Sequence, residues 1–150
     1  MARQANDLMA QYAAYHRDRR NIATHFVGIP LIVFAIGVLL ARAQFHVADW
    51  TVSAAWVVWG AATIWYLTRG NFVLGLSTAI VNAVLMALAH PLAAGSVGGW
   101  LAWGLGSFLV GWIIQFVGHY YEGRKPAFVD DLIGLLVGPM FVVGEALFAM

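Results

Sequence analysis

Two polar segments stand out in this largely apolar chain, and both contain histidine. Residues 15–25, YHRDRRNIATH, contain His16 and His25 and carry four of the chain's 8 basic and 7 acidic residues. Residues 115–131, QFVGHYYEGRKPAFVDD, contain His119 and Glu122. Imidazole is a good ligand for iron, zinc and copper. Three histidines with a carboxylate could therefore form a mononuclear metal site with open positions for a substrate or O2.

The spacing within the first segment requires a break in the chain. Nine residues separate His16 from His25, about 900° of rotation on a helix, so on one straight helix the two rings would point in opposite directions. They can converge only if the chain breaks between them, and we expect this at residues 18–21. Asn21 lies four residues before His25 and therefore on the same helix face, where it could cap the helix or orient a histidine.

The second segment predicts the end of a helix with three polar side chains on one face. Gln115 and His119 are four residues apart, and His119 and Glu122 are three apart, so all three share a face if the helix continues through Glu122. Gly123 and Pro126 indicate that the helix ends directly after it.

Composition predicts the environment of these segments. The chain has 150 residues, of which 62% are hydrophobic and only 10% charged, and this is typical of one integral membrane domain covering residues 1–150. The net charge of +1 gives no reason to expect nucleic acid binding. The absence of cysteine excludes disulfides, thiolate metal sites and cysteine nucleophiles.

The apolar runs predict an all-α membrane bundle with four spans. A span needs about 20 apolar residues, and suitable stretches cover residues 24–41, 50–68, 72–89 and 100–118, with a turn at residues 90–99. Residues 4–16 are amphipathic and predict a helix lying on the membrane surface. The apolar tail, residues 132–150, could span the membrane, re-enter it or lie at its interface.

Basic residues orient this bundle. One side receives Arg3, Arg17, Arg19, Arg20, Arg69, Arg124 and Lys125, whereas the other receives only Arg42. The excess predicts a cytoplasmic N-terminus. His16, His25 and His119 then share the cytoplasmic side, with His46 and His90 opposite. We expect His46 to be a loop residue and His90, which precedes a proline in the predicted turn, to be structural.

Each of these polar residues also has a simpler interpretation. His16 could lie at the level of the lipid headgroups, His25 could hydrogen-bond at a helix start, and His119 could interact with a helix dipole. Arg124 and Lys125 could only set the topology or could bind a carboxylate. The common side of the three histidines favours a shared site.

The two segments carry a resemblance to a known family. The residues that match are Tyr15, His16, Asn21 and His25 in the first segment and Gln115, Phe116, Gly118, His119, Glu122, Pro126 and Ala127 in the second. In this pattern the chain resembles the family of the fungal endoplasmic-reticulum 2-hydroxy fatty acid dioxygenase and its bacterial relatives.

The resemblance implies an Fe(II)-dependent enzyme of fatty acid α-oxidation, which uses O2 to convert a 2-hydroxy fatty acid to a fatty acid one carbon shorter. It implies that His16, His25 and His119 are the catalytic metal ligands, with Glu122 as a fourth ligand or as a partner of the ligands. We expect the substrate to be bound by Arg124, Lys125, Asn21 and Gln115. The protein would then be an integral protein of a bacterial inner membrane.

Two other classes of function remain open at this point. Histidines can be axial ligands of haem, so the chain could be a haem-binding membrane protein. It could also be a non-catalytic membrane scaffold or a small transporter. The sequence does not predict an oligomeric state.

Overall fold

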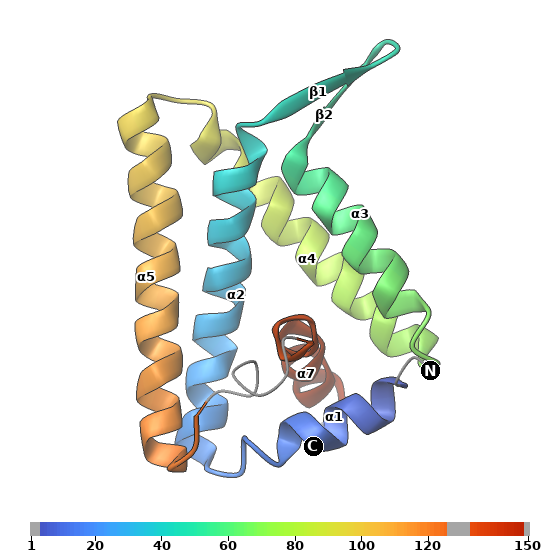
Figure 1. Cartoon of the computed structure of the whole chain (residues 1–150), viewed down its shortest axis with the longest axis vertical. Coiled ribbons are helices and arrows are strands. Elements are labelled where there is room, and N and C mark those ends of the chain that lie inside the picture. The colour runs from blue at the N-terminus through green and yellow to red at the C-terminus, as the bar shows by residue number, and fades with distance from the viewer. Residues whose placement is uncertain (1–3, 126–132, 149–150) are drawn as a thin grey trace.

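The computed structural model describes residues 4–125 and 133–148, and it shows a mainly helical protein (Figure 1). The helices are α1 (Ala5–Ala13), α2 (Arg19–Ala41), α3 (Ala54–Leu67), α4 (Phe72–Ala93), α5 (Val97–Glu122) and α7 (Gly134–Phe148). Strands β1 (Gln44–Val47) and β2 (Trp50–Ser53) form an antiparallel hairpin between α2 and α3.

Helices α2 and α5 lie side by side and antiparallel, and glycines of α5 allow their close approach (Figure 1). A Cβ atom added at Gly118 would overlap the side chains of Thr24 and Asn21, and one added at Gly111 would lie 2.7 Å from Ile32. Small residues at helix contacts are the usual means of packing inside membranes. The start of α2 is therefore held directly against the end of α5.

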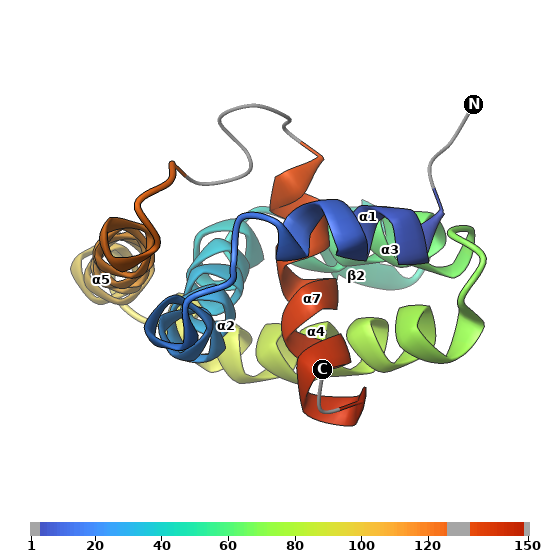
Figure 2. The same cartoon turned by 90° about the horizontal axis from the view of Figure 1, so that it is seen from below.

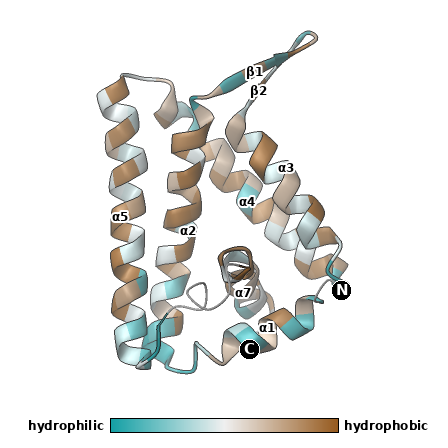
Figure 3. Cartoon of the chain, in the orientation of Figure 1, coloured by the Kyte–Doolittle hydropathy of each residue, from teal (hydrophilic) through white to brown (hydrophobic). Residues whose placement is uncertain are grey.

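Within the described residues, three helices, α2, α4 and α5, are long and apolar enough to cross a membrane. Helix α3 has 14 residues, about 21 Å, and is shorter than a hydrocarbon layer of about 30 Å. The predicted helical bundle is thus confirmed in its main features, whereas its fourth span remains a prediction. Hydrophilic residues gather where α2 begins and α5 ends (Figure 3).

The hairpin departs from the predicted all-α fold. Residues 50–53 pair with residues 44–47 instead of extending the next helix, so the predicted span at residues 50–68 shortens. Helix α3 begins at Ala54, where the side chain of Ser53 accepts a hydrogen bond from the backbone N–H of Trp56. The pairing satisfies backbone groups and the serine cap starts the helix.

The predicted turn at residues 90–99 is also shorter than expected, because α4 continues through Pro91 to Ala93. The guanidinium of Arg42 donates to the carbonyls of Ala93 and Gly95 at 2.9 and 2.8 Å. These bonds satisfy carbonyls left free at the helix end. His90 consequently lies in a helix, and His46 lies in strand β1 rather than in a loop.

The tail of the chain forms α7, which runs crosswise to α2 and α5. It is seen nearly end-on in Figure 1 and lengthwise in Figure 2. Its buried residues Val137, Met140, Phe141 and Val143 pack against α1 and the end of α3. Helix α1, predicted as residues 4–16, ends at Ala13 and packs its apolar face on α7. Leu132 and the residues after Phe148 lie outside the described part of the chain.

Candidate metal centre

The break between α1 and α2 comes earlier than the sequence predicted. Helix α1 ends at Ala13 and α2 begins at Arg19, so His16 lies in the link between them. Asp18 caps α2 by accepting a hydrogen bond from the backbone N–H of Arg20. The prediction that Asn21 could be the cap was therefore wrong, because Asp18 already fills that position and Asn21 lies in the first turn.

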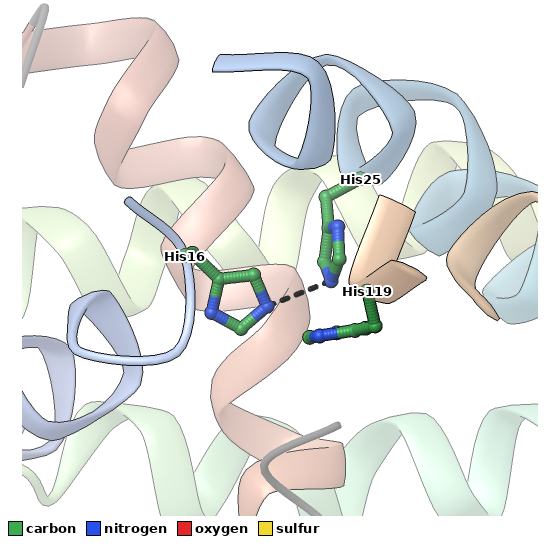
Figure 4. A group of neighbouring side chains, drawn as sticks. All are labelled: His16, His25 and His119. Carbon is green, nitrogen blue, oxygen red and sulfur yellow. Dashed lines mark hydrogen bonds between the residues drawn. The ribbon is translucent and has the colours of Figure 1, made fainter. Parts of the chain in front are cut away.

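The structure brings His16, His25 and His119 together (Figure 4). One nitrogen from each ring can be chosen so that all three atoms lie within 4.8 Å of one another. The ring of His16 lies 4.2 Å from that of His25 and 4.9 Å from that of His119, centroid to centroid. All three side chains are buried. The link and the adjoining α2 thus supply two of the rings, and the distant α5 supplies the third.

Hydrogen bonds fix the orientation of two of the rings. Nδ1 of His16 lies 2.7 Å from the carbonyl oxygen of Tyr12, and Nδ1 of His25 lies 2.8 Å from that of Asn21. A carbonyl only accepts, so each Nδ1 carries the hydrogen and, in the neutral ring, each Nε2 presents a lone pair. The two Nε2 atoms face each other at 2.8 Å (Figure 4). Such a contact requires a shared cation, either a proton or a metal ion.

The surroundings disfavour the proton. Burial lowers the pKa of His16 from 6.5 to about 4, with the neighbouring His119 as a smaller cause in the same direction. A metal-binding histidine typically donates its other ring N–H to a carbonyl or carboxylate, as His16 and His25 do. The buried Nδ1 of His119 has no hydrogen-bond partner among the described residues. The three rings therefore fit a transition-metal ion.

Glu122 holds the cluster together from its edge. Its Oε1 accepts hydrogen bonds from the backbone N–H groups of Arg17 and Asp18, at 2.7 and 2.8 Å, and from the amide of Asn21 at 3.1 Å. Among the described residues, the group that could hold a metal comprises the three histidines without Glu122. The Glu122 carboxylate thus connects the end of α5, which carries His119, to the link that carries His16 and to the first turn of α2.

Tyr12 and Phe141 also belong to the site, although the sequence analysis did not include them. The Tyr12 ring stacks on His16, with centroids 4.0 Å apart, and Phe141 of α7 packs against both rings. Tyr12 precedes His16 by four residues, as Asn21 precedes His25, and this repeated spacing was the signal available in the sequence. No comparable signal marks Phe141, because its contacts are long-range.

The four predicted substrate-binding residues have different surroundings from one another in the structure. Gln115 is buried beside the cluster, and its Oε1 has no partner among the described residues. The amide of Asn21 donates to Glu122 and to the carbonyl of Tyr15. Arg124 bonds to the carbonyl of Ala14 and lies over the Tyr15 ring, 4.2 Å from its centroid. Lys125 is exposed at the same end of the molecule.

A cavity of about 300 Å³ opens beside the histidines, between α2, α5 and α7. Gln115, His25 and His119 line one part of it, and the rest is mostly apolar. An apolar pocket with a few convergent polar groups is typical of small-molecule sites.

Comparison with known proteins identifies the family of this chain. Residues 2–150 match the family described as 2-hydroxy-palmitic acid dioxygenase Mpo1-like. The chain is 32% identical over 150 residues to the 2-hydroxy-palmitic acid dioxygenase MPO1 of Saccharomyces cerevisiae, covering 96% of this chain and 82% of the yeast protein. No solved structure matches the chain. With a match along nearly its whole length, this chain belongs to the Mpo1-like family.

Proposed function

We propose that this protein is an Fe(II)-dependent dioxygenase that uses O2 to convert a 2-hydroxy fatty acid to a fatty acid one carbon shorter. The observation that carries the proposal is the pair of Nε2 lone pairs on His16 and His25, which face each other beside His119 in a buried cluster. The similarity to a 2-hydroxy-palmitic acid dioxygenase supports the substrate class.

His16, His25 and His119 would hold the iron. Bound there, Fe(II) would supply redox and Lewis-acid chemistry toward O2 and toward a 2-hydroxy acid. Glu122 acts as a positioning residue, because its carboxylate is engaged by the link and by Asn21. The stacked Tyr12 and the packed Phe141 shield the cluster from water on the side of α1 and α7.

Gln115 is the residue best placed to bind the polar end of the substrate. It lines the cavity together with His25 and His119, and the unpartnered Oε1 is costly unless a ligand or water satisfies it. Its amide suits the hydroxyl or carboxyl group of a 2-hydroxy acid. Arg124 and Lys125 lie at the end of α5 and could attract the carboxylate before it reaches the cluster.

The activity is tested with protein purified without O2 and loaded with Fe(II). On addition of 2-hydroxypalmitate and O2, we expect O2 uptake and, by mass spectrometry, the fatty acid one carbon shorter. Palmitate, which lacks the hydroxyl, is the matched control and should give neither. A haem absorption spectrum in the purified protein would contradict the proposal in favour of a haem protein. Iron-loaded protein without turnover would favour a scaffold.

We also propose that α3 completes four membrane crossings in a bacterial inner membrane, with the N-terminus in the cytoplasm. The excess of basic residues supports this orientation. The backbone N–H of Ala5 donates to the carbonyl of Arg69 at 2.7 Å, so α1 and the turn between α3 and α4 lie at the same end. Single cysteines at the exposed Ala10 and Lys125 should be labelled only from the cytoplasm, and one at Asp49 only from outside. Labelling of Ala10→Cys and Lys125→Cys from opposite sides would contradict the topology.

A further inference from the structure

The cavity beside the histidines is an elongated groove rather than a compact pocket. The residues of α2 that line the groove are spaced by three, four or one positions, so they lie on one face of that helix. The residues of α5 that line it likewise share one helix face. Residues 134–139 of α7 lie across the part near the histidines. The two long walls are formed by His25, Ile29, Ile32, Val33 and Ile36 on α2 and by His119, Gln115, Trp112 and Phe108 on α5.

The groove changes from closed and polar to open and apolar along its length. The exposed fraction is 1% at His25, 6% at Ile29, 8% at Ile32 and 38% at Ile36. Ile36 lies 11 residues beyond His25, about 17 Å along the helix axis. Since α2 starts with charged residues, Ile36 lies at the depth of the lipid tails. The groove is thus closed at the histidines and open sideways toward the hydrocarbon.

We propose that this groove holds the alkyl chain of the 2-hydroxy fatty acid, with the end of the chain at the opening at Ile36 and Phe108. The identity of this ligand rests on the proposed function. The acid and hydroxyl groups lie at Gln115 and the histidines, where the buried Oε1 of Gln115 has no partner among the described residues. The opening at Ile36 and Phe108 sets which chain lengths are favoured.

Two observations favour an alkyl chain as the occupant. The walls beyond Gln115 are aliphatic and aromatic, so they suit an alkyl chain better than a polar group. A volume of about 300 Å³ lies at the small end of the range for ligand sites, and the groove is long and narrow rather than round.

The first test measures occupancy without using catalysis. The chain has no cysteine, so Ile36→Cys carries a unique thiol at the opening, and Leu109→Cys is the control, since Leu109 neighbours Phe108 but is exposed to the lipid. Both are labelled with an apolar maleimide in lipid nanodiscs. We expect 2-hydroxypalmitate to slow labelling of Ile36→Cys at least tenfold, 2-hydroxyoctanoate to slow it much less, and neither to affect Leu109→Cys.

Equal protection of Ile36→Cys by the two acids would overturn the proposal, because protection would then not depend on a chain long enough to reach Ile36. Labelling of Ile36→Cys that is slow without any acid and unchanged by adding one would also overturn it, since a bilayer lipid would then occupy the groove. Protection without turnover in the wild-type protein would retain the groove as a fatty acid site and reject the proposed reaction. The two failures are thereby distinguishable.

The second test changes the opening and measures kcat/KM over a series of chain lengths. Ile36→Trp narrows the groove at its open end, so the preference for the C16 over the C10 acid should fall, because only the longer chain reaches this position and loses packing contacts there. Phe108→Ala widens it and should move the optimum to longer chains. Leu109→Trp and Leu109→Ala, the matched controls, should keep the wild-type profile. An unchanged profile in both opening variants, with full activity, would overturn the proposal.

Discussion

His25 and His90 lie in different parts of the bundle and use the same local hydrogen bond, yet their surroundings give them different roles. In each, Nδ1 bonds to the carbonyl four residues earlier, that of Asn21 for His25 and of Met86 for His90. Each ring therefore turns its Nε2 lone pair away from its own helix. The partner that this lone pair meets distinguishes the two histidines.

At the far end, His90 meets a proton donor. Its Nε2 lies 2.7 Å from the hydroxyl of Ser53, which can donate its hydrogen, and its ring stacks on Trp56. At the cluster, Nε2 of His25 meets the Nε2 of His16, which has no hydrogen to give in the neutral ring. A helical histidine thus becomes a candidate metal ligand through the group that faces its Nε2, whereas its own helix only orients the ring.

Substitution of Glu122 tests how far the cluster depends on the groups around it. Glu122→Ala removes the acceptor of two hydrogen bonds from the link carrying His16 and of one from Asn21 of α2, so iron affinity should fall by about 10–100-fold, as for other groups that orient metal ligands. Glu122→Gln keeps an oxygen in place and should remain within a few-fold of the wild type. Iron titration of the metal-free variants measures both.

Equal losses in the two Glu122 variants would instead indicate that the negative charge itself binds the metal. Wild-type affinity in Glu122→Ala would show that the link needs no support from α5.

A smaller effect is expected from pH in the metal-free protein. The pKa of His16 is lowered by burial to about 4, against 6.5 in an unfolded chain, so the unfolded state binds more protons between these values. Stability should therefore rise with pH across this window, and at pH 5 it should be lower than at pH 7 by about 2 kcal/mol from this residue. Thermal unfolding in detergent measures the trend.

His16→Gln should make this pH profile shallower without removing it, because two other buried histidines remain in the cluster, whereas His90→Ala should leave it in place. An unchanged profile in His16→Gln would mean that other groups set the acid sensitivity.

The smallest expected effect is at His90 itself. His90→Ala removes the bonds to Ser53 and Met86 and the stacking on Trp56, so stability should fall by about 1–2 kcal/mol. Iron content should be unchanged, because the ring lies outside the cluster. Loss of iron from a folded His90→Ala protein would show that the two histidine environments are coupled.

Much of this arrangement could be predicted from local sequence patterns. Apolar runs located α2, α4 and α5, and Gly123 correctly marked the end of α5, where it adopts a positive φ of 73°. The four-residue and three-residue spacings correctly placed Gln115, His119 and Glu122 on one helix face. The incompatible spacing of His16 and His25 correctly required a break between them.

The parts that could not be predicted depend on contacts between distant segments. The hairpin was missed because residues 50–53 are compatible with a span until they pair with residues 44–47. Phe141 reaches the cluster because α7 packs against α1. The apolar sequence of the tail alone does not indicate in which direction this helix runs. Glu122 was predicted as a ligand or a partner of ligands, and only the folded chain shows its three donors.

The three-histidine metal site is tested by the iron content of four variants purified without O2 and reconstituted with Fe(II). The wild-type protein and His90→Ala should each hold one iron per chain. His16→Ala, His25→Ala and His119→Ala should each lose it while still inserting into the membrane. If any two of these three variants keep the wild-type iron content, the three histidines are not the metal site.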